Sequence, residues 1–209
     1  MREQPYEGLS LFGQSGSRKY LNAAERRRFL ESAQRLPPHE RSFCQVLAWS
    51  GARISEVLAL VPAAFDIESG AASIPTLKRR RRGIVRQVPL PPDLLSNLEH
   101  LFCLVAAQRD PELAGKRIWR FSRTTAWRCV KAVMASAGIT GMPAMPKGLR
   151  HGFGVKAFQA NVPPHLVQRW LGHASLRTTA IYAEVVGPEE RAFAARMWSA
   201  STETLALRE

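Results

Sequence analysis

Four short motifs of this 209-residue chain bring together guanidinium, ammonium, imidazole and phenol groups. In chain order they read GARISE at residues 51–56, TLK at 76–78, KGLRH at 147–151 and LGH at 171–173, and Tyr182 follows nine residues after His173. A tyrosine hydroxyl becomes a nucleophile only when its surroundings activate it. Arginine guanidinium groups grip phosphate oxygens as planar forks and stabilise developing negative charge. The motifs therefore bring together the residue types that attack by a tyrosine on an arginine-bound phosphate would need.

At these residues the sequence resembles the catalytic domain of the tyrosine recombinases, the phage-integrase type of site-specific recombinase. That family carries an A-R-x-S-E motif, a hairpin lysine, an H-x-L-R-H motif, an L-G-H motif and a tyrosine at the spacing seen here. Thr178 and Thr179, before Tyr182, are also typical of it. The resemblance covers residues 20–198, and the order of the four motifs makes it specific.

The resemblance implies a site-specific DNA recombinase or integrase that cuts and rejoins double-stranded DNA. Tyr182 would form a covalent 3′-phosphotyrosyl intermediate, and no ATP, metal or other cofactor would be needed. Lys78 would protonate the departing 5′ oxygen. The remaining expected catalytic residues would surround the phosphate; they are Arg53, Lys147, Arg150 and His173.

Lys147 departs from the family pattern, which usually has histidine at this position. Lysine supplies charge and a hydrogen-bond donor, but it acts as a base only if burial or neighbouring cations lower its pKa substantially. We therefore expect Lys147 to stabilise charge rather than to transfer a proton. His151, four residues later, is explained equally well as a structural residue or as a functional one.

The charge balance points to a polyanionic partner. The chain has 30 Lys and Arg against 17 Asp and Glu, a formal net charge of +13. Basic side chains bind nucleic acid by neutralising phosphates and releasing counterions. The candidate DNA contacts are a basic loop and further exposed cations, namely Arg79, Arg80, Arg81, Arg82, Arg86, Arg123, Arg128 and Lys131.

The same residues also allow simpler interpretations and different functions. Taken alone, Arg53 and Glu56 could be an ion pair on a helix, and the basic loop a solvated surface. Residues 163–184 are also consistent with helix, glycine turn and helix, which is typical of a helix-turn-helix regulator. A degenerate recombinase that binds DNA without cutting it, a type IB topoisomerase and a telomere resolvase are further alternatives. None of the purely structural interpretations predicts the order of the motifs.

The hydrophobic pattern predicts an α+β fold, mostly α-helical, in which a helical catalytic domain carries a small antiparallel three-stranded sheet. Strands are expected at residues 65–67, 72–74 and 84–90. Val105 and Trp127 are expected in the core, and the cysteines are expected to be buried thiols. Helices are expected at about residues 22–36, 39–50, 53–60, 91–108, 122–137, 147–160, 163–171, 175–184 and 188–200.

Residues 1–19 are polar and predict a flexible N-terminal arm, and residues 20–209 form the predicted catalytic domain. The family commonly adds an N-terminal helical domain that completes a clamp on DNA, which nineteen polar residues cannot form. Three explanations are open for the missing domain: the chain is a minimal recombinase, it is truncated, or a partner supplies the other half of the DNA clamp. The resemblance also implies homo-oligomers, dimer to tetramer, on DNA.

The sequence gives no sign of a membrane segment, a secretion signal or a metal site. No apolar run approaches the roughly 20 residues that a membrane helix needs. The five histidines and three cysteines lack ligand spacing. We therefore expect a cytoplasmic protein, associated with the bacterial nucleoid when it is bound to DNA.

Overall fold

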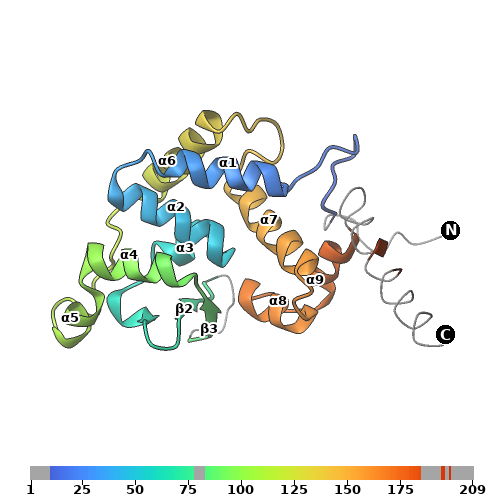
Figure 1. Ribbon diagram of the computed structural model, residues 1–209. Coiled ribbons are helices and arrows are strands. Elements are labelled where there is room, and N and C mark those ends of the chain that lie inside the picture. Colours follow the sequence, from blue (N-terminus) through green and yellow to red (C-terminus); the bar gives the residue numbers. More distant parts are fainter. Residues whose placement is uncertain (1–9, 78–82, 185–193, 196–197, 199–209) are drawn as a thin grey trace, which may run out of the picture.

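A computed structural model describes residues 10–77, 83–184, 194–195 and 198 of the chain (Figure 1). Its architecture confirms the predicted fold class, because helices surround one small antiparallel sheet. Over these residues the helices are α1 (Ala23–Ala33), α2 (Pro38–Ser50), α3 (Ile54–Val57), α4 (Pro92–Phe102), α5 (Leu104–Arg109), α6 (Arg123–Ser136), α7 (Pro146–Gln159), α8 (Pro164–Leu171) and α9 (Arg177–Ala180), with 3₁₀ turns η1 (Pro62–Ala64) and η2 (Ile181–Glu184).

Local sequence explains where the main helices begin and end. The Asn22 side chain accepts from the backbone N–H of Glu25, and the Glu25 carboxylate accepts in return from the backbone N–H of Asn22, so α1 begins with a capping box. Ser122 caps α6 by accepting from the backbone N–H of Thr125. Gly51 ends α2 in the left-handed conformation, with φ of 61°. These three boundaries agree with the sequence prediction.

The sheet has the order β1-β2-β3, formed by Phe65–Asp66, Ala71–Pro75 and Val85–Pro89. Both pairs are antiparallel, and Ile74 lies opposite Arg86 in the register of β2 and β3. Along β3, the side chains of Arg86 and Val88 are buried while their neighbours are exposed. The pleat therefore turns Arg86 toward the interior.

Two hydrophobic clusters support the fold. The larger one joins α1, α2, α4, α6 and the sheet, and includes Trp119, whose ring meets those of Phe43 and Phe102 edge to face. The smaller one gathers residues from the N-terminal segment, α7, α8 and η2, and includes Tyr182. In Figure 1, α7, α8 and α9 lie on the opposite side of the molecule from α4 and α5.

Three side chains that were expected in the core are exposed: Cys103, Val105 and Trp127. The first two are exposed because the helix expected at 91–108 is interrupted at Cys103, which takes a left-handed φ of 47° and ends α4. The break changes the helical phase, so Leu104 is buried while Cys103 and Val105 are exposed. Trp127 is also exposed, at 41%, because it lies beside rather than on the α6 face that buries Ala126 and Val130.

Further boundaries differ from the prediction as well. Residues 10–19 are not a flexible arm, because Leu11 is buried and a β-bridge joins Phe12 to Arg18. The helix expected at 53–60 is limited to α3, and the one expected at 175–184 is divided into α9 and η2. Most of the helix expected at 188–200 lies outside the described residues.

Gly148 offers a test of how α7 meets the loop before it. A methyl group at this position would overlap the backbone carbonyl oxygen of Pro143, which cannot move aside as a flexible side chain could. Alanine normally stabilises a helix interior relative to glycine by about 0.5–1 kcal/mol. We expect Gly148→Ala instead to destabilise the fold by about 1–3 kcal/mol in urea unfolding.

Gly115→Ala is the matched control, because nothing lies within 4 Å of a Cβ there. Equal unfolding midpoints for the two variants would contradict the close approach of Gly148 to Pro143.

Candidate active site

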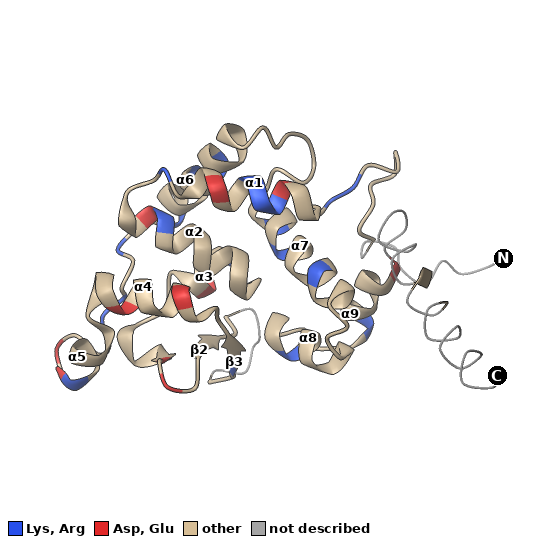
Figure 2. Cartoon of the chain, in the orientation of Figure 1, with Lys and Arg blue, Asp and Glu red and all other residues tan. Residues whose placement is uncertain are grey.

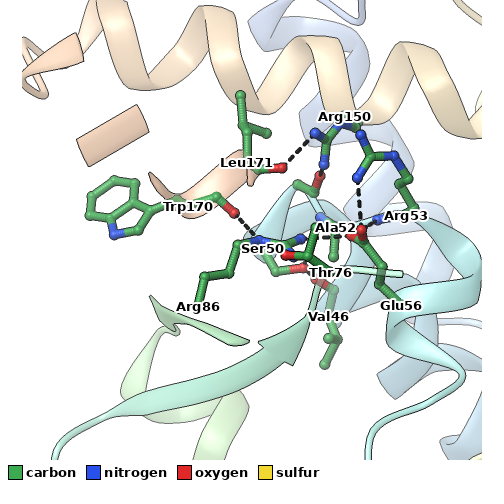
Figure 3. A network of polar contacts seen from close by, with 11 residues as sticks. Val46, Ser50, Ala52, Arg53, Glu56, Thr76, Arg86, Arg150, Trp170 and Leu171 are labelled. Atoms are coloured by element: carbon green, nitrogen blue, oxygen red, sulfur yellow. Dashed lines mark hydrogen bonds and ion pairs between the residues drawn. The ribbon is translucent and has the colours of Figure 1, made fainter. Parts of the chain in front are cut away.

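Glu56 holds two arginines in place beside the candidate site (Figure 3). Its carboxylate is fully buried. Oε1 accepts from the guanidinium of Arg53 at 2.7 Å and Oε2 from that of Arg86 at 2.7 Å. Oε2 also accepts from the backbone N–H of Arg53 at 3.0 Å. The short helix α3 therefore fixes both the backbone and the side chain of Arg53.

Arg86 is an interior residue, which corrects its prediction as a DNA contact. It is 5% exposed. Besides Glu56 it donates to the carbonyl of Trp170 at 2.6 Å and to the hydroxyl of Thr76 at 3.1 Å. Its guanidinium thus connects α3, the residue after β2 and the end of α8. The alternation of β3 explains why it points inward.

Arg150 makes a second buried connection to the end of α8. Its guanidinium donates to the carbonyl of Gly51 at 2.8 Å and to the carbonyl of Leu171 at 2.6 Å. Burial, together with the nearby positive charge of Arg53, lowers the pKa of Arg150 to about 10. The side chain is therefore still a cation at neutral pH, and two carbonyls fix its direction.

A pocket of about 570 Å³ collects the residues that the sequence singled out. Five of the six predicted catalytic residues line it, and the sixth, Lys78, lies outside the described residues. The five are Arg53, Lys147, Arg150, His173 and Tyr182. They come from the start of α3, from α7, from the turn after α8 and from η2, so residues far apart in sequence meet at one place.

Tyr182 lies at the inner wall of this pocket and is 1% exposed. Its ring packs on Gly154 of α7, where a Cβ would come within 2.5–2.7 Å of three ring carbons. Its hydroxyl lies 3.1 Å from Nδ1 of His151. Burial raises the pKa of Tyr182 to about 12, although Arg150 and Arg53 act in the opposite direction. The phenol is thus protonated at neutral pH.

His173 faces the same pocket as a neutral ring. Burial, followed by the charges of Arg150 and Arg53, lowers its pKa to about 3. Its Nδ1 lies 2.9 Å from the hydroxyl of buried Thr179. We assign the hydroxyl as donor to Nδ1, which leaves the Nε2 hydrogen of His173 free to donate to a ligand in the pocket.

The surroundings of the pocket are strongly basic. Residues 113–183 contain eleven Lys or Arg and no Asp or Glu, and Figure 2 shows α6 to α9 without acidic segments. Of the predicted DNA contacts, Arg123 lines the pocket and Arg128 is exposed on α6. Lys131 instead donates to the carbonyl of Ala144 at 2.7 Å, so it is not a free cation. Arg79, Arg80, Arg81 and Arg82 lie outside the described residues.

Sequence reasoning did not select several residues that shape the site. His151 was left undecided, although it follows Lys147 by four positions and so shares its helix face. Gly154 gave no separate signal, because its contact with Tyr182 depends on how η2 returns to α7. Thr179 was noted only as typical of the family, and its contact with His173 was not predicted. Trp127 was assigned to the core but lines the pocket, as does Ser10.

Two further observations concern function. Among the described residues, no group of three or more His, Cys, Asp or Glu could hold a metal ion. In the same part of the chain, no helix is long and apolar enough to cross a membrane.

The helix-turn-helix alternative is not favoured by the geometry after α8. Gly172 ends α8 with a positive φ of 65°, as a turn requires. The next helix, α9, has only four residues and continues into η2, where Tyr182 is buried. A recognition helix needs an exposed face that enters a DNA groove, and this segment instead delivers Tyr182 to the pocket.

Replacing Glu56 tests the ion-pair network. Burial raises the pKa of this carboxyl, but Arg86, the backbone N–H of Arg53 and the charge of Arg53 outweigh burial, so the pKa lies below its ordinary value. A carboxyl with a lowered folded-state pKa stabilises the fold above its unfolded pKa, and this contribution is lost as pH falls through the folded pKa. We expect Glu56→Gln to cost about 3–5 kcal/mol in urea unfolding at neutral pH, because Arg86 keeps a buried charge without a counter-charge.

The difference between the wild type and Glu56→Gln should shrink as the pH drops below the ordinary range of a glutamate. Glu31→Gln is the control, since Glu31 forms only an exposed ion pair with Arg27 and should change stability little. A stability difference for Glu56→Gln that does not depend on pH would contradict the network.

Comparisons with known proteins place these features in a family. The model of the phage integrase family matches residues 19–187. Tyrosine recombinase XerA of Pyrococcus furiosus is 28% identical over 171 residues, which are 80% of this chain and 57% of that protein. Tyrosine recombinase XerD of Mycobacterium tuberculosis is 33% identical over 154 residues, which are 69% of this chain and 47% of that protein.

Solved structures show the same fold. A crystal structure of XerA recombinase matches with a TM-score of 0.70 and 23% identity, covering 85% of this chain and 64% of that chain. XerH site-specific recombinase bound to a palindromic difH substrate, a post-cleavage complex, matches with a TM-score of 0.68 and 25% identity, covering 91% and 57%. The chain spans about half the length of the curated relatives. Because the family match covers most of its residues, the chain belongs to the phage integrase family of tyrosine recombinases.

Proposed function

We propose that this protein is a site-specific DNA recombinase or integrase, and that Tyr182 cuts and rejoins double-stranded DNA through a covalent 3′-phosphotyrosyl intermediate. The observation that carries the proposal is the convergence of Arg53, Arg150, His173 and Tyr182 on one pocket. These residues belong to separate motifs, and structural roles alone do not explain why they meet.

The geometry supports binding of a phosphodiester between the two arginines. Arg150 is held by two carbonyls and Arg53 by Glu56, so neither side chain has to be ordered when a phosphate arrives. Donors that are fixed in advance stabilise transition-state charge without a cost of reorganisation during the reaction. His173 adds a neutral N–H donor on the same side as Tyr182.

Bond exchange then conserves the phosphodiester energy. The hydroxyl oxygen of Tyr182 attacks phosphorus, the bond to the 5′ oxygen breaks, and Lys78 protonates that oxygen by analogy with the family. The 5′ hydroxyl of a partner strand reverses the step. Lys147, exposed at the pocket rim, contributes positive charge to phosphate binding.

The basic surroundings support the DNA substrate class. Two of the predicted DNA contacts are exposed in the structure, Arg123 at the pocket and Arg128 on α6. XerH in a solved complex is bound to a palindromic difH substrate, and we propose that this chain binds duplex DNA across the pocket described above. By the same resemblance it would act as a dimer to tetramer on DNA, in the cytoplasm.

Trapping on a nicked duplex tests the reaction. The duplex carries the sequence that the protein selects from a random-sequence pool, with a nick beside the cut so that the released fragment diffuses away. Wild-type protein should form a covalent, protease-sensitive adduct at the 3′ end, seen as a shifted band on a denaturing gel. Tyr182→Phe should bind the duplex and form no adduct, because the attacking oxygen is gone.

Absence of the adduct with wild-type protein on its selected sequence would contradict the enzymatic proposal. An adduct that persists in Tyr182→Phe would contradict the assignment of the nucleophile alone.

Gly154→Ala tests whether the position of Tyr182 matters. The added methyl group collides with the tyrosine ring and should displace the hydroxyl from its place beside the arginines. A displacement of about 1 Å can cost about 10²-fold in rate, so we expect adduct formation to slow by that order while DNA binding persists. Gly115→Ala, in open space, is the control, and equal cleavage rates for the two variants would contradict the prediction.

A further inference from the structure

The attack by Tyr182 leaves one proton without an evident destination. The phenol is protonated at neutral pH, since burial raises its pKa to about 12. Once its oxygen is bonded to phosphorus, the proton must leave. The guanidinium groups of Arg53 and Arg150 cannot take it, because both already carry their full complement of protons.

His151 is the described residue that meets this oxygen. Its Nδ1 lies 3.1 Å from the hydroxyl oxygen of Tyr182, within the reach required of a proton acceptor. The two rings are tilted, with centroids 5.9 Å apart. Both residues line the pocket. A phenol is a stronger donor than an imidazole N–H, so we assign the Tyr182 hydroxyl as donor and Nδ1 as acceptor.

We propose that His151 is a catalytic residue of this chain, whose Nδ1 accepts the phenolic proton of Tyr182 during cleavage and returns it during rejoining. This inference rests on the proposed function and extends it. In cleavage the bond from the tyrosine oxygen to phosphorus forms, and the bond to the 5′ oxygen breaks. The phenolic proton passes to Nδ1, and the 5′ oxygen receives its proton from a separate donor. Rejoining reverses each transfer.

The surroundings keep His151 ready to accept a proton. Burial, followed by the charges of Lys147, Arg150 and Lys19, lowers its pKa to about 4, so the ring is neutral at physiological pH. The titratable groups that surround it are Lys147 and Arg150 of α7, Lys19 of the N-terminal segment, His173 after α8 and Tyr182 of η2. Because the pKa of the phenol is far higher, the proton stays on Tyr182 until the new bond to phosphorus forms.

A bound phosphate would make His151 a better acceptor of the phenolic proton. Two of the cations that lower the pKa of His151, Lys147 and Arg150, line the pocket. A bound phosphodiester would offset their charge and so favour the imidazolium. The transfer is thereby tied to the presence of DNA. During rejoining, when the phosphate leaves Tyr182, the same cations favour return of the proton from His151 to the phenol oxygen.

Lys147 is the competing acceptor, since it stands where the family usually has histidine. It lies one helical turn before His151 on α7 and is exposed. An ammonium group has three N–H donors and no lone pair that could accept a proton. Lys147 can therefore supply charge, while His151, which is half-buried and in hydrogen-bond contact with the nucleophile, takes the proton.

His151→Asn separates proton transfer from hydrogen bonding. The amide oxygen of asparagine can occupy the place of Nδ1 and accept from Tyr182, but it cannot take up the proton. In the nicked-duplex assay we expect the rate of adduct formation to fall by about 10²- to 10⁴-fold, with unchanged affinity for DNA. His100→Asn, on the exposed face of α4, is the matched control and should cleave at the wild-type rate.

The pH profile gives a readout that a structural role would not change. The wild-type rate should be flat from about pH 6 to about pH 9, because His151 is neutral throughout. Without an internal acceptor, the reaction must use the phenolate of Tyr182, so the rate of His151→Asn should rise about tenfold per pH unit over the same range. Lys147→Ala should be slower than wild type and keep the flat profile.

Added imidazole provides a second readout. His151→Ala opens space beside Tyr182 in a pocket that is open to solvent, and imidazole in the buffer should restore adduct formation. More basic imidazoles should restore it further, as expected when the added base takes a proton in the slow step.

Each outcome decides one claim. A wild-type rate in His151→Asn would overturn the inference, and so would a slower reaction with a flat pH profile and no imidazole rescue, which would mean that His151 only supports the structure. A rising profile in Lys147→Ala in place of His151→Asn would make Lys147 the acceptor. In all of these cases wild-type protein still forms its adduct, whereas loss of that adduct would overturn the proposed function itself.

Discussion

The carboxylate of Glu56 is the interaction on which the site depends. Three guanidinium groups lie close together, and the charge of Arg53 helps to lower the pKa values of Arg86 and Arg150. Buried like charges repel strongly where water cannot screen them. Glu56 lies between Arg53 and Arg86 and binds both at 2.7 Å, so the fold holds its cations together with one internal counter-charge. This leaves Arg53 partly exposed toward the pocket while Arg86 stays inside.

The end of α8 is fixed by the same network. The carbonyls of Trp170 and Leu171 are the last of that helix, and they accept from Arg86 and Arg150. Terminal carbonyls of a helix lack partners within the helix and favour cations. The two arginines therefore supply the hydrogen-bond donors that these carbonyls lack, and the carbonyls in turn orient the arginine side chains. Because His173 comes two residues after Leu171, the position of its imidazole depends on the arginines that hold the end of α8.

The sequence predicted the parts of this arrangement that local patterns specify. The hydrophobic pattern located most helices, and the order of the motifs identified five residues that share the pocket. Burial within that set depends on contacts between distant segments, which the sequence does not display. Arg86 and Arg123 look alike in the sequence, but the register of β3 buries the first and α6 exposes the second. The break at Cys103 and the meeting of His151 with Tyr182 depend on tertiary packing in the same way.

Burial and nearby charge act on Tyr182 in opposite directions. Tyr182 belongs to a hydrophobic cluster and packs on Gly154, so burial keeps its phenol protonated while the surrounding cations favour ionisation. Nearby imidazoles are neutral for the same reason, since burial and cations both disfavour their charged forms. The proposed phosphodiester substrate would change both conditions at once, because it would bring negative charge to the arginines and an electrophile to the phenol. In the proposed reaction, Tyr182 would therefore be activated by the bound phosphodiester, and not by a permanent charge of its own.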